Sequence, residues 1–347
     1  MNRIVILFLL LTLLSGTTLV LISKHWFPIW LGLELSTLSI LPILSSNTWS
    51  RGNEATLKYF LVQAFSAAIL LNGATLNLWL AGSWEISSTN DYLVHSIISL
   101  AIIIKLGLAP CHFWFPDVLS GISFNNGIII ACWQKIAPLV LIANLNNFLA
   151  SELFILCAVL SVLVGAWGGL NQVSTRKILA YSSIGHMGWI TCTLFFSVEV
   201  AIILFLFYIL NNALIFCICS SNTLSHLSTL SKINGNPTST LLFSLALLSL
   251  GGLPPLGGFI NKLIPISIFA INNSLIIIPL FIIGSLISLY FYLRVTFNTS
   301  LTLFPQNSLS LVSTRTTGTS YHSVAISILA PLTLWGILLV PLLYLFI

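Results

Sequence analysis

The chain has 347 residues, of which 57% are hydrophobic and only 5% are charged, and its formal net charge is +5. An ordinary soluble domain carries about 25% charged residues, so this chain cannot build a water-exposed surface of the usual kind. A mean hydropathy of +1.06 indicates that lipid is its solvent and that helices satisfy its backbone polar groups. We therefore expect an all-α polytopic membrane protein.

The sequence lacks the usual signatures of redox, metal and nucleotide chemistry. Its six cysteines stand in apolar stretches without a C-x-x-C pair, and we expect them to be small buried hydrophobes. The segment GGLPPLGG at 251–258 lies between apolar runs, without the strand–loop–helix context of a phosphate-binding loop. The basic residues are dispersed singly, which is typical of topology signals and does not indicate a nucleic acid partner.

Apolar windows follow one another along the chain and predict about eleven membrane-spanning helices of roughly 20 residues each. The first window has no A-x-A-like site after it and is long, so we expect a retained helix and not a cleaved signal peptide. Short polar loops are expected at 45–53, 168–177 and 225–239, and a longer one at 304–322. The windows lie at 3–22, 26–46, 57–80, 93–119, 124–145, 149–170, 177–195, 199–220, 240–270, 274–296 and 323–347.

Charged residues near the ends of the windows predict the orientation. Alternating sides of the membrane carry unequal numbers of cations, and the cation-rich side should face the compartment from which the chain inserts. The N-terminus lies on that side. It holds Arg3, Arg51, Lys58, Arg176, Lys177, Lys232, Arg294 and Arg315 against Glu54 and Asp117, whereas the other side holds Lys24 against Glu85, Asp91, Glu152 and Glu199.

Four charges remain well inside the windows: Glu34, Lys105, Lys135 and Lys262. A lysine at the centre of a membrane costs about 2.5 to 3.5 kcal/mol, so such residues are functional candidates by default. A buried lysine changes its affinity for a proton when a nearby carboxylate moves. We expect Glu34 to meet Lys105, from which a proton would pass to Lys135 and on to Lys262.

Histidines and packing offer both support and an alternative. His112 and His186 are candidate proton stations because histidine titrates near neutral pH. Alternatively, they could be core residues that bond to neighbouring helices. In that case Glu34 and Lys105 would form a static ion pair and Lys135 would extend toward the membrane surface.

Two of the windows are interrupted by prolines. Pro110 and Pro116 are expected to break the fourth window twice, and the pair Pro254 and Pro255 to break the ninth just before Lys262. Broken helices at membrane depth are tolerated where they line a cavity.

The positions of the two breaks predict an internal duplication. They are equivalent if the chain contains two five-helix repeats, which would be inverted because five is odd. Within a single transmembrane domain, we expect the repeats at 1–146 and 147–296, followed by a loop and the final helix at 297–347.

Four motifs carry a resemblance to a known family: NEATLKYFLVQA at 53–64, KLGLAPCHFWFPDVLSG at 105–121, STRKILAYSSIGHMGWI at 174–190 and SLGGLPPLGGFINK at 249–262. Together they closely resemble the subunit 2 family of NADH dehydrogenase, antiporter-like membrane subunits of mitochondrial complex I. The number of windows is similar to that of the shortened animal form. The resemblance implies an antiporter-like fold of two inverted repeats, each with one broken helix.

The same resemblance implies roles and partners. Glu34 would be the family's glutamate, Lys105 the lysine before the first break, Lys135 the central lysine and Lys262 that of the second broken helix, with His112 and His186 in matching motifs. The chain would pump protons in the inner mitochondrial membrane, with its positive loops facing the matrix. Other subunits would hold NADH, FMN, iron–sulfur clusters and ubiquinone, and would drive it by electron transfer.

Its expected partners are other membrane-arm subunits, including antiporter-like neighbours, and lipids such as cardiolipin. Two alternatives stay open. One is a scaffold subunit without a proton path of its own, and the other is an Mrp-like cation/proton antiporter subunit.

Overall fold

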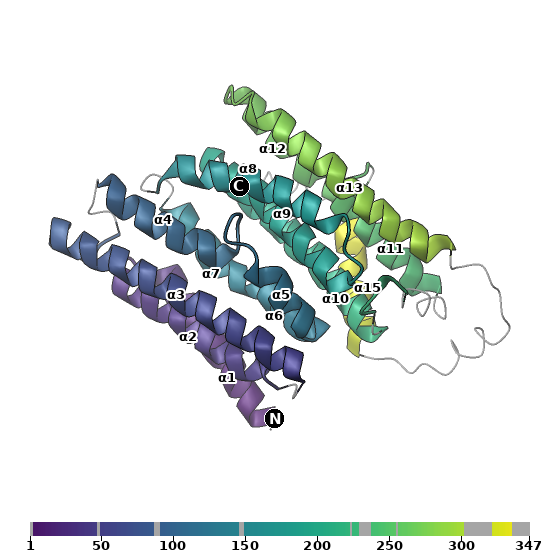
Figure 1. Cartoon of the computed structure of the whole chain (residues 1–347), viewed down its shortest axis with the longest axis horizontal. Coiled ribbons are helices and arrows are strands. Elements are labelled where there is room, and N and C mark those ends of the chain that lie inside the picture. The colour runs from purple at the N-terminus through teal and green to yellow at the C-terminus, as the bar shows by residue number, and fades with distance from the viewer. Residues whose placement is uncertain are drawn as a thin grey trace. The chain divides into compact units, whose positions relative to one another are not determined.

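The structure, a computed structural model, describes residues 3–46, 49–86, 91–145, 149–222, 224–228, 237–254, 256–301 and 321–334. These residues are almost entirely helical, apart from turns and two isolated bridges, which confirms the predicted all-α class. The chain divides into two compact units (Figure 1). The first comprises Met1–Ile122 and Ile129–Ser161, and the second comprises Ser123–Ile128 and Val162–Ile347.

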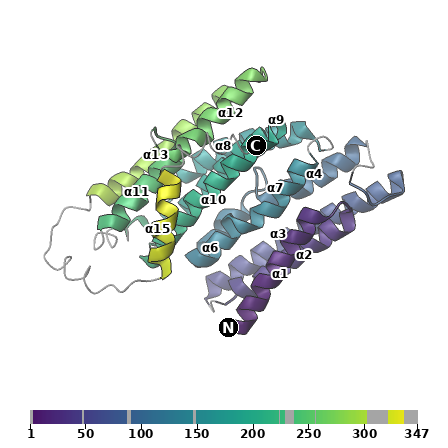
Figure 2. The ribbon, with the colours of Figure 1, turned by 180° about the vertical axis from the view of Figure 1, so that it is seen from behind.

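The first unit begins with three helices that lie side by side: α1 (Arg3–Ile22), α2 (Trp26–Leu44) and α3 (Ser50–Ala81) (Figures 1 and 2). Glycines bring the first two into backbone contact. A Cβ at Gly16 would lie 2.8 Å from the Gly32 carbonyl oxygen, and one at Gly32 would lie 2.7 Å from that of Gly16. Small residues permit this close approach, which is how helices commonly associate in lipid.

The fourth window forms the first broken helix. It consists of α4 (Tyr92–Leu106) and α5 (Trp114–Gly121), both of which contact α3. The prediction of a second break at Pro116 is wrong. Pro116 lies in the first turn of α5, where a residue without an N–H group removes no intrahelical hydrogen bond.

The fifth window is irregular where a continuous helix was expected. It contains α6 (Phe124–Ala131), the 3₁₀ turn η1 (Trp133–Lys135) and α7 (Ile136–Asn144). Pro138 explains the irregularity because it cannot donate to the carbonyl of Gln134 and its ring crowds that carbonyl.

The second unit contains the second broken helix, as predicted. In this helix, α11 (Pro237–Gly251) is followed by η3 (Gly257–Phe259) and α12 (Ile260–Ile271). The turn at Gly258 lies so close to α11 that a Cβ there would collide with the Ser249 carbonyl. The other helices are α8 (Ser151–Gly169), which continues from the first unit, α9 (Thr175–Phe196), α10 (Val198–Ser221), α13 (Ile277–Leu301) and α15 (Tyr321–Leu334).

Seven of the described helices are long and apolar enough to cross a membrane, and a count of about eleven spans stays a prediction. The expected loop at 45–53 is shorter than predicted, because α3 already begins at Ser50. Residues 302–320, with Arg315, and residues 335–347 of the final window lie outside the described residues, as does Lys232.

Candidate functional site

The end of α4 places Lys105 in its last turn. Gly107 ends the helix at a φ of 71°, in the left-handed region that glycine adopts readily. Two side chains bond the carbonyls left over at this end. The indole of Trp114 donates to the Ile104 oxygen at 3.3 Å, and the Gln63 amide donates to the Lys105 oxygen at 3.5 Å. The carboxyl end of the half-helix is therefore held by α3 and α5.

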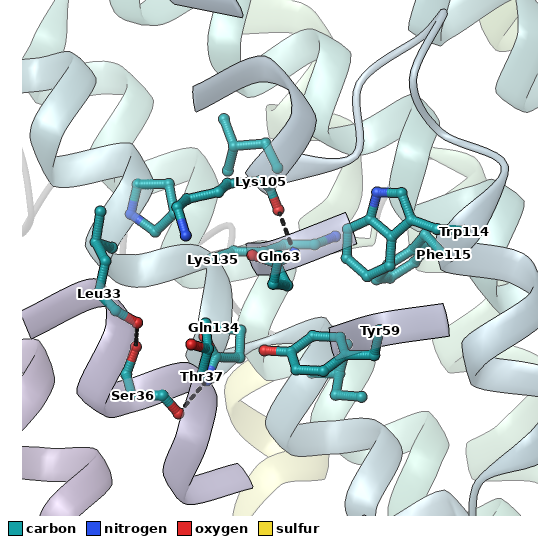
Figure 3. A pocket seen from close by; sticks show the side chains of 13 residues that line it. Leu33, Ser36, Thr37, Tyr59, Gln63, Lys105, Trp114, Phe115, Gln134 and Lys135 are labelled. Atoms are coloured by element: carbon teal, nitrogen blue, oxygen red, sulfur yellow. Dashed lines mark hydrogen bonds between the residues drawn. The ribbon is translucent and has the colours of Figure 1, made fainter. Parts of the chain in front are cut away.

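Lys105 and Lys135 line the same pocket in the first unit (Figure 3). Lys105 is only 6% exposed and Lys135 only 4% exposed. Residues of seven helical segments, α2 to α7 and η1, line this pocket, and its wall combines apolar surface with amide and hydroxyl groups. The other lining residues are Leu33, Ser36, Thr37, Tyr59, Gln63, Leu106, Trp114, Phe115, Ile130, Gln134 and Pro138.

Among the residues that the structure describes, the ammonium of Lys105 has no hydrogen-bond partner. The charge of Glu34 acts on it electrostatically, but the two are not in direct contact: Glu34 instead accepts a hydrogen bond from the Thr37 hydroxyl at 3.2 Å. The static contact pair that the sequence suggested is thus absent from this part of the structure. The Tyr59 hydroxyl, which also feels the Glu34 charge, is likewise buried without a protein partner.

Lys135 is held differently. It lies in the 3₁₀ turn before Pro138, and its Nζ is 4.5 Å from the centre of the Phe115 ring. Figure 3 shows the side chain extending across the pocket toward the rings of Phe115 and Trp114. This is cation–π geometry. Lys135 therefore points into the protein and does not extend to the membrane surface.

Sequence reasoning missed the neutral members of this pocket. Gln63 stands in the middle of an apolar window, and a glutamine there is itself a signal of a buried polar site. Gln134, whose amide donates to the Ser36 carbonyl at 3.3 Å, gave a similar signal beside Lys135. Tyr59 and Phe115 gave none, because aromatic residues are ordinary in such windows.

The second unit holds a comparable site around Lys262. Its ammonium reaches back across the break and donates to the Gly251 carbonyl at the end of α11. Lys262 lines a pocket with His186, Tyr181, Ser182 and Tyr292, among others. The Tyr292 hydroxyl lies 3.5 Å from Nε2 of His186. The structure thus brings Lys262 and His186 together.

His112 lies elsewhere, within the first break. Its Nδ1 bonds the Pro110 carbonyl at 3.1 Å, which requires a proton on Nδ1 and leaves Nε2 as the acceptor of the neutral ring. The ring is buried and stacks near Phe113. It is not one of the residues lining the pocket of Lys105 and Lys135.

The chemistry of these sites suits proton transfer. Among the described residues, no three His, Cys, Asp or Glu side chains lie close enough to hold a metal ion together. Ammonium groups donate hydrogen bonds and repel cations. An amine beside hydroxyl and amide groups can, by contrast, take up and release a proton.

Family models match almost the whole chain. Residues 23–288 match the transmembrane family described as NADH:quinone oxidoreductase/Mrp antiporter. Residues 289–344 match the NADH dehydrogenase subunit 2 C-terminus.

Curated relatives and solved structures agree with these matches. NADH-ubiquinone oxidoreductase chain 2 of Pisaster ochraceus is 46% identical over 99% of each chain. That of Strongylocentrotus purpuratus is 49% identical over 95% of this chain and 93% of its own. A chain of respiratory complex I from Thermus thermophilus superposes with a TM-score of 0.83 at 27% identity, covering 98% of this chain and 80% of its own.

A chain of the Mrp complex from a Dietzia species shares the fold alone. Its TM-score is 0.75 at 18% identity, and the match covers 86% of this chain and 60% of that one. The match to the subunit 2 C-terminus and the relatives that cover almost the whole chain favour the NADH dehydrogenase branch of this fold over the Mrp antiporter branch. The chain belongs to the NADH dehydrogenase subunit 2 family, whose fold is that of the antiporter-like membrane subunits.

Proposed function

We propose that this chain is a membrane-arm subunit of complex I and that it carries protons across the inner mitochondrial membrane through its buried lysines. One observation carries the proposal. Two lysines from different helical segments are almost fully buried in one pocket whose wall includes amide and hydroxyl groups. Burying two like charges is costly unless one of them loses its proton or water and opposite charges surround them.

The first transfer runs between Lys105 and Lys135. Glu34 is the carboxylate whose charge acts on Lys105, and moving a carboxylate relative to a buried lysine changes the proton affinity of that lysine. Water bound between the Tyr59 hydroxyl and the Gln63 and Gln134 amides, where buried polar groups need such partners, would then pass the proton to Lys135. Lys135 accepts it as a neutral amine, after releasing its own proton toward Lys262.

The second unit continues the transfer in this proposal. Lys262 would accept the proton, with His186 and the Tyr292 hydroxyl beside it as a relay. His112 would serve the first break through the free Nε2 of its ring. An imidazole ring can accept a proton on one nitrogen and release one from the other, which suits both histidines to a relay.

Electron transfer from NADH to ubiquinone in other subunits would drive the cycle. Those subunits would hold NADH, FMN, the iron–sulfur clusters and ubiquinone. The neighbours in the membrane arm would include further antiporter-like subunits, with lipids such as cardiolipin at the periphery. The cation-rich loops and the N-terminus would face the matrix, as the positive-inside rule predicts.

The scaffold alternative predicts that Lys105 or Lys135 faces lipid. Their low exposure and shared pocket oppose it. The antiporter alternative predicts that activity depends on sodium.

Replacing Lys135 tests the proposal. Lys135→Met keeps most of the length of the side chain and removes the titratable group, and Lys24→Met, at an exposed position, is the matched control. We expect vesicles containing the assembled complex to pump fewer protons per NADH oxidised with Lys135→Met, and a normal number with Lys24→Met. Normal pumping with both would favour the scaffold, and pumping that requires sodium would favour the antiporter.

A further inference from the structure

The second break has an unusual feature at Gly252. This residue follows the last residue of α11 and has a φ of 75°, and its N–H donates to the Ser249 carbonyl at 3.0 Å. Gly252 therefore caps the C-terminus of α11 in the left-handed backbone conformation, for which glycine is the common choice. The last carbonyls of α11 need partners from outside the helix.

The side chain of Lys262 fills the space beside this cap. Lys262 comes from the first turn of α12, and its ammonium bonds the Gly251 carbonyl. A Cβ placed on Gly252 would lie 2.7 Å from Cδ of Lys262, 2.9 Å from Cε and 3.2 Å from Nζ. The lysine stem thus occupies the volume that any other residue at position 252 would need.

Gly82 shows what the cap conformation requires by itself. It ends α3 with a φ of 70°, but a Cβ there would meet nothing within 4 Å. At Gly82 the need for glycine is conformational only. At Gly252 the backbone has the same conformation, and a Cβ would in addition contact Cδ, Cε and Nζ of Lys262.

We propose that Gly252 is a positioning residue for Lys262: its lack of a side chain lets the lysine lie against the end of α11 with its ammonium on the Gly251 carbonyl. A cation is favoured at the carboxyl end of a helix. This contact therefore fixes the position of the Lys262 ammonium at the pocket that Lys262 lines with His186 and Tyr292. This inference rests on the proposed function, in which Lys262 carries a proton.

Gly252→Ala tests the inference, with Gly82→Ala as the matched control, because Gly82→Ala imposes the same backbone conformation in open space. We expect Gly252→Ala to lose protons pumped per NADH several-fold in the assembled complex, and Gly82→Ala to pump normally. Equal behaviour of Gly252→Ala and Gly82→Ala would overturn the positioning role.

A double-mutant cycle shows whether the effect acts through Lys262. In a Lys262→Met background, Gly252→Ala should cause no further loss of pumping, whereas a merely structural effect would add to it. If Lys262→Met itself pumped normally, the proposed function of Lys262 would fail and the inference with it. Normal pumping by Gly252→Ala beside impaired Lys262→Met would reject the inference alone.

Gly252→Asn serves as the second test variant in case Gly252→Ala does not fold, because asparagine tolerates the left-handed backbone conformation. This variant should assemble and still displace the lysine, so it should show the same pumping defect. Gly82→Asn is its control. If Gly252→Asn did not assemble while Gly82→Asn did, the position would be structural and the inference would be rejected.

Discussion

The two lysines of the first unit have different surroundings. Within the described part of the chain, the Lys105 ammonium has no hydrogen-bond partner and interacts electrostatically with Glu34, whereas Lys135 lies over the Phe115 ring. A cation–π contact is worth about 2 kcal/mol or more when it is shielded from water. We infer that the Phe115 ring holds the Lys135 ammonium in one position, whereas the Lys105 ammonium relies on water and on the Glu34 charge for its stabilisation.

Phe115→Leu should leave the Lys135 ammonium less firmly held. Leucine keeps the site apolar but removes the ring, so the Lys135 ammonium loses about 2 kcal/mol of favourable contact. We expect fewer protons pumped per NADH in vesicles with Phe115→Leu and near-normal pumping with Phe115→Tyr, which keeps a ring. Phe65→Leu is the control, since Phe65 is 62% exposed. Identical pumping by the Leu and Tyr variants would show that the ring is unimportant.

The sequence was informative where a residue contrasts with its window. Glu34, Lys105, Lys135 and Lys262 could be selected because charges are rare in apolar runs. The absence of direct contact between Glu34 and Lys105 could not be predicted, because it depends on how the two helices that carry them, α2 and α4, are rotated about their axes. Phe115 was missed for a different reason: one more aromatic residue in an apolar segment carries no signal.

At the scale of helices, glycine and proline determine where the regular structure stops. Gly107 and Gly252 end the first halves of the two broken helices, and the sequence located both breaks from their glycine–proline clusters. Pro116 and Pro138 show the limit of that reasoning. Each lies in the first turn of its helix, α5 or α7, and interrupts neither helix, although Pro138 prevents the preceding 3₁₀ turn from joining α7 as regular helix.

Gly165 illustrates how tightly α8 and α9 pack. A Cβ at Gly165 would lie 2.8 Å from the Gly185 nitrogen and 2.9 Å from the Tyr181 carbonyl oxygen, whereas one at Gly185 would meet nothing within 4 Å. Gly165→Ala should therefore destabilise the protein by about 1–3 kcal/mol through overpacking. Gly185→Ala is the matched control and should be neutral or slightly stabilising, because alanine favours helix.

The stability of the assembled complex measures this difference. We expect NADH oxidation to be lost at a lower temperature with Gly165→Ala than with Gly185→Ala. Equal midpoints for the two variants would contradict the close approach of the two backbones.

At the scale of the whole molecule, composition alone predicted an all-helical membrane protein, and the motifs at 53–64, 105–121, 174–190 and 249–262 predicted the family. The family models and relatives confirm the second prediction. The inverted repeats at 1–146 and 147–296 stay a prediction, since their helices share a pattern of breaks but not of charges. Lys105 precedes its break and Lys262 follows its own.

Orientation can be tested by labelling. Lys24 and Arg51 are exposed and are assigned to opposite sides by the charge pattern. A membrane-impermeant thiol reagent applied to mitoplasts should label Lys24→Cys directly, and Arg51→Cys only after the membrane is permeabilised. A Cys111→Ser background removes the one partly exposed native cysteine. The reverse labelling pattern would invert the predicted topology.

The central claim is that buried lysines carry protons while the electron-transfer chemistry takes place elsewhere. The most direct measurement is the number of protons pumped per NADH oxidised by vesicles containing the assembled complex, native or with Lys105→Met. We predict a lower ratio or slower coupled turnover for the variant at an unchanged level of assembly. A normal ratio with normal turnover would contradict the claim and leave Lys105 as a packing residue.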